Sequence, residues 1–361
     1  MYMNTARVAL TFAGCFLGAG YVSGQELWQF FGSFGTFGFF GMIIAMLLIF
    51  LFGVLLLRLA SISKIAQCDK LIIRADNKFL RAFIGVAETF FLVGISVIMT
   101  AGGGALFIQT LGLSEYLTGG LFALLLFFLS LGGHQRMVSV FSMTVPFLIV
   151  FTLVVAVVSV SKFGFPDISA MNASSASGEN PLLSSWWISA VTFVCYNLFS
   201  SVQILAPVGV MVDSKKRVWL GVFFGTFVLL VIACSIFLSM ASLPASSKAP
   251  LPMLFVASEL SQVLGVIYSV LLFFGMLGTG LSCLVAVTHF VTEKTKIEKA
   301  KLPITLVLSV FIYFGSLFGF GDLIGVVYPL CGYLGVLAIA ALCEHYFHIR
   351  KTAYKNKQDD K

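Results

Sequence analysis

The sequence predicts an all-α polytopic membrane protein with ten transmembrane helices in two inverted repeats of five. Hydrophobic residues make up 59% of the 361 residues and charged residues 10%, against about 25% charged residues in a soluble domain. Apolar runs long enough to cross a bilayer recur along the chain, and basic residues occupy alternate connections between these runs. This composition disfavours a soluble enzyme, a nucleic-acid-binding protein and a secreted domain held by disulfides.

The ten predicted spans are apolar runs of the length that a bilayer requires, because a hydrocarbon core about 30 Å thick takes about 20 residues of helix. We expect the first run to be a retained span, since no cleavage site for a signal peptide follows it. A shorter run over 253–264, preceded by Pro252, predicts a re-entrant or interfacial half-helix on the outer face. The spans cover residues 6–31, 37–59, 82–109, 117–133, 137–161, 185–209, 217–241, 265–291, 302–320 and 322–343.

The basic residues set the orientation of these spans. With ten spans, 20 of the 22 lysines and arginines fall on one side of the membrane, and only Lys162 and Lys248 fall on the other. Short connections rich in lysine and arginine stay in the cytoplasm. We therefore expect a multi-pass protein of the cell inner (cytoplasmic) membrane, with both termini cytoplasmic and residues 163–184 outside.

Landmarks recur at similar offsets in the two halves of the chain. They are a weak point in the first helix of each half, a glycine cluster in the third and a proline in the fifth, at offsets of 179, 176 and 183 residues. Because each half has an odd number of spans, the second half enters from the opposite face, which makes the repeats inverted. The predicted parts are a first repeat over 1–163, an extracellular linker over 164–184, a second repeat over 185–345 and a cytoplasmic tail over 346–361.

A resemblance to a known family begins at the weak point of the first helix. The stretch Gly18-Ala19-Gly20-Tyr21-Val22-Ser23-Gly24-Gln25-Glu26 resembles the first-helix signature of the YkvI-type bacterial membrane proteins, which are relatives of amino-acid permeases. Ten spans in 5 + 5 inverted repeats, with broken first and sixth helices, resemble the LeuT-type fold of the amino acid-polyamine-organocation superfamily. The resemblance implies a transporter whose substrate binds between the two breaks.

The residues predicted to bind substrate lie at the two weak points. A helix broken inside the membrane leaves backbone N–H and C=O groups that need a ligand or a cavity, and the freed N-terminus of a half-helix suits a carboxylate. The alternatives are that the glycines form a packing seam and that the hydroxyls bond their own helix. The candidates are Gly18, Ala19, Gly20, Tyr21 and Ser23 in the first helix, Gly103 in the third, and Tyr196, Asn197, Ser200 and Ser201 in the sixth.

Two kinds of coupling remain open. The resemblance implies a shared sodium site at Gly14, Leu17, Thr279 and Ser282, but the next hydroxyl position is Cys283, a poor ligand for a hard cation. A proton carrier needs an ionisable group at depth, and Glu26 and Glu88 are the acidic residues inside predicted spans. We expect Glu88 in an inner polar network that carries a proton, and Glu26 at the outer gate or in helix packing. The alternative for each is a protonated acid hydrogen-bonded to a neighbouring helix.

The sequence therefore predicts a secondary active transporter of a small amino acid or similar zwitterion, working by alternating access and driven by protons or sodium. A membrane receptor or sensor that binds such a ligand without transporting it is the alternative. No H-E-x-x-H motif or Ser-His constellation indicates an enzyme. We expect no cofactor, no metal beyond sodium, no nucleic acid and no obligate protein partner; the expected partners are a small-molecule substrate and the lipid bilayer.

Overall fold

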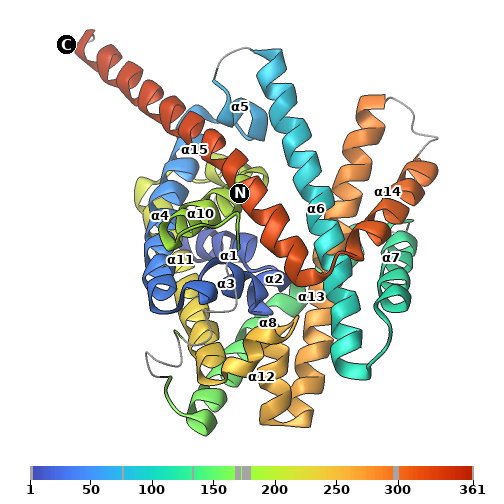
Figure 1. Cartoon of the computed structure of the whole chain (residues 1–361). Helices are drawn as coiled ribbons and strands as arrows, with labels where there is room; N and C mark the ends of the chain where they lie inside the picture. Colours follow the sequence, from blue (N-terminus) through green and yellow to red (C-terminus); the bar gives the residue numbers. More distant parts are fainter. Residues whose placement is uncertain are drawn as a thin grey trace.

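The computed structural model describes residues 3–74, 77–131, 134–166, 172, 180–295 and 301–359, and these residues form α-helices joined by short connections (Figure 1). Most of the predicted extracellular linker lies outside this described part. The first half contains α1 (Thr5–Phe16), α2 (Ala19–Val22), α3 (Gln25–Phe30), α4 (Gly35–Ser63), α5 (Cys68–Ile72), α6 (Lys78–Leu111), α7 (Glu115–Leu131) and α8 (His134–Phe163). The second half contains α10 (Trp186–Val210), α11 (Lys215–Ser242), α12 (Pro252–Leu260), α13 (Gln262–Thr295), α14 (Lys301–Ser316) and α15 (Phe320–Asp359).

The helices have the length and surface of membrane spans. Within the described residues, seven helical segments are long and apolar enough to cross a bilayer, and three shorter apolar helices are Thr5–Phe16, Tyr116–Leu131 and Lys301–Ser316. Large apolar side chains are exposed at helical spacing, as at Phe83, Val86 and Phe90 on α6. A helix face of this kind suits lipid rather than water. The chain is a multi-pass membrane protein, while the count of ten spans stays a prediction.

The first predicted span is interrupted twice. α1 ends at Phe16, and Leu17 and Gly18 leave the helical conformation before α2 begins. A second turn follows the four residues of α2, and there Gly24 adopts a φ of +84°. A side chain at Gly24 would be strained by this φ and would contact Met240 and Met253. The chain therefore crosses the centre of the molecule as three short helices that differ in direction.

The sixth predicted span is not broken, which corrects one expectation. α10 runs without interruption through the polar window that we expected to unwind. Hydroxyls of Ser200 and Ser201 donate to the carbonyl of Asn197 in the preceding turn, and the amide of Asn197 donates to the carbonyl of Phe193. Polar side chains that bond their own backbone are compatible with a continuous helix. The window also holds no glycine or proline, the residues that most often interrupt a helix.

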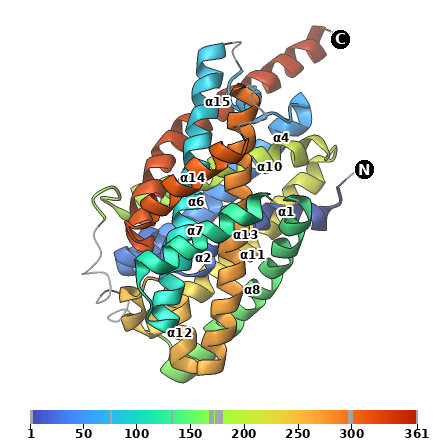
Figure 2. The same ribbon diagram turned by 90° about the vertical axis from the view of Figure 1, so that its right-hand side faces the viewer.

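The helices pack in two groups, each with members from both halves. α1 and α4 pack with α10 and α11, whereas α6 and α7 pack with α13 and α14. α8 packs against α11 and α13, and α15 packs against α10 and α6. Figures 1 and 2 show α12 at one end of the molecule, and α2 midway between its two ends. The interruption of the first span therefore lies deep inside the protein.

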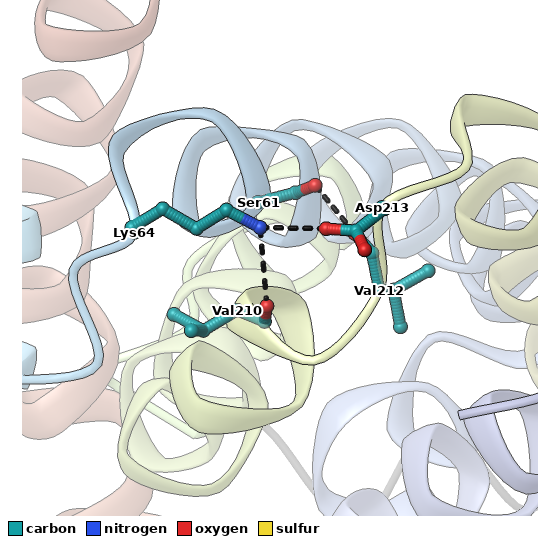
Figure 3. Close-up of polar contacts among 5 residues, drawn as sticks. All are labelled: Ser61, Lys64, Val210, Val212 and Asp213. Carbon is teal, nitrogen blue, oxygen red and sulfur yellow. Dashed lines mark hydrogen bonds and ion pairs between the residues drawn. The ribbon is translucent and has the colours of Figure 1, made fainter. Parts of the chain in front are cut away.

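At the end opposite α12, polar contacts join the two halves (Figure 3). Nζ of Lys64, which follows α4, lies 2.7 Å from Oδ1 of Asp213, in the connection between α10 and α11. The hydroxyl of Ser61 donates to the carbonyl of Val212. Both connections were predicted to lie on the basic side of the membrane. Both charged side chains of the pair are about half exposed, so the ion pair contributes at most about 1 kcal/mol to stability.

Candidate functional site

The candidate site is centred on the carboxylate of Glu26, in the first turn of α3. The reversal at Gly24 directs this side chain back toward α2. Oε2 of Glu26 lies close to Gly20, 3.2 Å from the position that a Cβ atom on Gly20 would occupy. The hydroxyl of Tyr196 on α10 donates a hydrogen bond to Oε1 of Glu26. Only 4% of the Glu26 surface is exposed. A carboxylate so deeply buried in a membrane protein marks a functional site more often than a structural one.

This position differs from the one predicted for Glu26. Counting residues along an unbroken helix placed it toward the outer mouth, six residues past the break. The turn over Ser23 and Gly24 shortens that separation, so the carboxylate lies beside Gly20, within the break region. The sequence contained a signal for this turn in Gly24, whose φ of +84° suits glycine above other residues.

Aromatic rings surround the carboxylate. The rings of Tyr196 and Tyr328 stack with centroids 4.7 Å apart, and the hydroxyl of Tyr328 would lie 3.5 Å from a methyl group at Gly20. Phe91 on α6 contacts both rings, and Phe30 contacts Tyr196. Tyr328 was not among the predicted site residues, although this tyrosine directly precedes Pro329, one of the repeated landmarks. Four helices thus contribute to one aromatic cluster around one acid.

The break itself borders open space. A Cβ atom at Gly18 would meet no atom within 4 Å, and the same holds for Gly14 on the preceding turn. By contrast, Tyr21 and Ser23 are fully buried, and their hydroxyls donate to the carbonyls of Leu229 and Gly20. Ala19 is also buried, against α13. Of the predicted first-helix residues, Gly18 borders open space, and Tyr21 and Ser23 hold the interrupted backbone in place.

The other predicted substrate residues also fall into two groups, those near Glu26 and those engaged in helix packing or in bonds to their own helix. Tyr196 and Asn197 are buried near Glu26, and the Asn197 amide donates to the carbonyl of Phe193 in its own helix. Ser200 and Ser201 bond their own helix. Gly103 does not reach the site, because a side chain there would collide with the ring of Phe122 on α7. Gly102 and Gly103 instead pack closely against neighbouring helices, as the alternative interpretation expected.

Glu88 lies in a separate cavity at the end of the molecule that carries Lys64 and Asp213. The cavity holds about 490 Å³, and α5, α6, α10 and α13 contribute to its wall. Glu88 is 8% exposed, and its Oε1 atom has no hydrogen-bond partner among the described residues. The side chains of Gln203 and Cys68 line the same cavity, near the carboxylate. Glu88 therefore lies among polar side chains, and one of them, Gln203, comes two residues after the polar window of α10. The proton-carrying network stays a prediction.

The residues expected to bind sodium lie on two segments, α1 with the residue after it and α13. The hydroxyls of Thr279 and Ser282 donate to carbonyls of their own helix, at Gly275 and Gly278. The first-helix positions, Gly14 and Leu17, lie on the segment that packs against α11 and α10. No hydrogen bond between these two sets is found in the described part of the chain. Leu17 offers a backbone carbonyl outside the helix, the feature that the resemblance requires of it.

Comparison with known proteins identifies relatives along the whole chain. No family model matches it. The uncharacterized membrane protein YkvI of Bacillus subtilis (strain 168) is 27% identical over 343 residues, covering 94% of this chain and 95% of that protein. The uncharacterized protein YyaD of the same strain is 23% identical over 336 residues, covering 92% of this chain and 94% of that protein. The chain is a relative of the YkvI-type membrane proteins.

Among solved structures, a Na⁺-coupled sialic acid symporter in a substrate-bound outward-open state is similar in fold. The superposition has a TM-score of 0.66 and covers 96% of this chain and 79% of the symporter, at 14% sequence identity. At this identity the match establishes the fold and no more. The chain therefore shares the fold of a secondary transporter over nearly its full length.

Proposed function

We propose that the protein is a secondary active transporter of a small amino acid or similar zwitterionic solute, working by alternating access. The observation that carries the proposal is the buried Glu26 carboxylate beside the interrupted first helix, with open space at Gly18. In this fold, substrate and ions bind near the midplane where helices are discontinuous. A carboxylate among tyrosines suits the ammonium group of a zwitterion, and the rings of Tyr196 and Tyr328 add favourable cation–π contact.

The packing pattern supports a 5 + 5 inverted repeat. If each half has five spans, α1, α4, α6, α7 and α8 correspond to α10, α11, α13, α14 and α15. The contact of α1 with α11 then matches the contact of α4 with α10, and the contact of α8 with α13 matches that of α15 with α6. This correspondence requires the three shorter helices to count as spans, which gives ten. It also retains the proposed division into repeats over 1–163 and 185–345.

The charge distribution supports an inner-membrane protein with both termini in the cytoplasm. The end of the molecule bearing Lys64, Arg74 and Asp213 would face the cytoplasm, and α12 would face outside. Lys162, one of the two basic residues predicted outside, donates to the carbonyl of Glu259 on α12. The two predicted outer features therefore meet at one end of the structure.

Coupling to a proton or to sodium would complete the transport cycle. For protons, Glu26 and Glu88 are the proposed carriers, one at the break and one in the inner cavity. For sodium, the proposed ligands are the carbonyls of Gly14 and Leu17 with the hydroxyls of Thr279 and Ser282. Proton coupling is supported by the burial of both carboxylates. Sodium coupling stays open, because a hydroxyl that donates its hydrogen to its own helix still offers its oxygen to a cation.

Uptake into proteoliposomes tests the proposal. A labelled panel of amino acids is offered with an imposed pH gradient, with a sodium gradient and with neither. We expect accumulation of at least one zwitterion under one gradient, and its loss in Glu26→Gln. The matched control is Glu344→Gln, which removes an exposed carboxylate paired with Arg74. Binding of a panel member without uptake under either gradient would instead identify a receptor.

A further inference from the structure

We infer that the inner cavity containing Glu88 is a second ligand site, selective for the ammonium group of a small organic cation or zwitterion. It is distinct from the break region around Glu26, whose residues do not line it. The cavity would bind its ligand whether or not the break region binds one.

The shape and wall of the cavity suit a small polar solute. Its volume of about 490 Å³ lies within the usual range for small-molecule pockets. Side chains of several helices converge on it, so the wall is built by the tertiary fold. The wall consists of Ala66, Gln67, Cys68, Asp69, Arg81, Ala82, Gly85, Glu88, Gln203 and Phe290.

The charge of the wall favours a cation. Two carboxylates, those of Asp69 and Glu88, face the cavity together with one guanidinium, that of Arg81. The formal charge of the lining is therefore −1 when all three are ionised. One monovalent cation neutralises it, whereas an anion would add to the excess.

The oxygen that would accept the ammonium group is identifiable. Oε1 of Glu88 is buried and has no hydrogen-bond partner among the described residues. A buried acceptor without a partner costs about 1 to 3 kcal/mol. Oε1 exposes less than 1 Å² of surface, so a rotation of the Glu88 side chain toward the cavity would present it to a donor on the ligand. The side-chain amide of Gln203 on α10 supplies a second polar group in the cavity wall, near the same carboxylate.

An ammonium ion fits this wall better than a metal ion. No group of three or more His, Cys, Asp or Glu side chains that could hold a metal is present in the described residues. The ring of Phe290 borders the cavity and lies 3.7 Å from the place of a Cβ atom at Gly85. An aromatic face attracts organic ammonium ions by cation–π contact. Carboxylate, amide and ring together are typical partners of an alkylammonium group.

Cys68 offers a direct test, because its thiol is part of the cavity wall. In a variant that keeps Cys68 and replaces the other six cysteines, two methanethiosulfonate reagents are compared: cationic aminoethyl and anionic sulfonatoethyl. Burial, reinforced by the nearby carboxylates of Glu88 and Asp69, raises the pKa of the Cys68 thiol, but the ratio of the two rates cancels the thiolate fraction. We expect the cationic reagent to react at least tenfold faster, after correction for their rates with free cysteine.

Two carboxyl-to-amide substitutions locate the source of this preference. Glu88→Gln should reduce the ratio several-fold. Glu344→Gln removes the same charge from the same end of the molecule but outside the cavity, and it should leave the ratio unchanged at physiological ionic strength, where exposed charges are screened beyond about 8 Å. An equal loss in both variants, or no preference in the parent, would overturn the proposal.

Binding itself is measured by protection. Methylammonium chloride should slow the modification of Cys68 by neutral N-ethylmaleimide, while potassium acetate at the same ionic strength should not. Gly85→Leu, which fills the cavity beside Phe290 without altering its charge, should abolish this protection while retaining a monodisperse protein with an unchanged unfolding temperature. Equal protection by potassium would overturn the assignment of an ammonium site, and protection that persists in both Glu88→Gln and Gly85→Leu would place the ligand elsewhere.

Discussion

Tyr196 on α10 donates its hydroxyl hydrogen to the carboxylate of Glu26 on α3, across a separation of 170 residues in sequence. The contact joins the first span of one half to the first span of the other. Since the ring of Tyr196 also stacks on Tyr328, its hydroxyl has a fixed direction. The orientation of the acid at the centre of the site therefore depends on a residue contributed by the second half.

Tyr196→Phe should weaken ligand binding by about tenfold or more. The substitution keeps the ring and its stacking but removes a hydrogen bond to an acidic group, worth about 1.5 to 3 kcal/mol when the acid is ionised. Binding of the solute identified by the uptake panel is measured by calorimetry on purified protein. Tyr333→Phe is the matched control, because its hydroxyl donates to the carbonyl of Leu182 on an exposed part of the surface. Unchanged affinity in Tyr196→Phe would remove Glu26 from the binding site.

Gly18→Val should abolish ligand binding and leave the fold intact. Open space surrounds Gly18, so the added side chain meets no protein atom near its Cβ position and occupies room that a ligand would need. Its φ of −84° and extended ψ of 169° are accessible to valine. Thermal unfolding and solute binding are measured together. Normal binding with normal stability would show that the space at Gly18 is not the ligand cavity.

Gly103→Leu should destabilise the protein without a specific effect on the affinity for solute. The new side chain would collide with Phe122 at the contact between α6 and α7, and overpacking of this kind costs about 1 to 3 kcal/mol. The expected result is a lower unfolding temperature, with the dissociation constant of the remaining folded protein unchanged. Weaker binding at unchanged stability would return Gly103 to the site.

Ser201→Ala should change binding and stability little. Its hydroxyl donates to the carbonyl of Asn197 within the same helix, and that carbonyl also accepts from Ser200. The loss is then close to that of a helical serine, a few tenths of a kcal/mol. The same measurement on Asn197→Ala gives the contrast, because Asn197 lies beside the carboxylate. A tenfold loss of affinity in Ser201→Ala would show that this hydroxyl turns toward the ligand.

Orientation is tested with single cysteines in a variant lacking the native ones. A cysteine at Ser184, exposed before α10, should react with an impermeant maleimide added outside intact cells, whereas one at Lys215, exposed at the start of α11, should react only after the membrane is permeabilised. The expectation follows from the distribution of basic residues. The reverse pattern would invert the assignment of the two faces.

The positions of the helices follow from local properties of the sequence, and the geometry of the site does not. Runs of apolar residues, glycines and basic connections place most helix ends to within a few residues, because each signal is local. The exception is α15, which continues as a helix to Asp359, far beyond the predicted end at 343 and through most of the predicted tail. The continuity of α10 depended instead on how Ser200, Ser201 and Asn197 satisfy each other, which composition alone does not reveal. The same limit applied to Glu26, whose depth was counted along a straight helix, and to Tyr328, whose partner lies more than a hundred residues away.

The contacts of α12 affect how easily this helix can move away from the first span. The N–H of Met253 donates to the carbonyl of Ser23, beside the second turn of the first span, and the side-chain amide of Gln109 both donates to and accepts from the backbone of Leu251. These three hydrogen bonds would separate together if α12 moved away. At about 1 kcal/mol each, they add about 3 kcal/mol to the free energy of any conformation in which α12 has moved away. Replacing Gln109 by alanine would remove two of the three bonds and lower the cost of moving α12, even though Gln109 lies far from Glu26 along the chain.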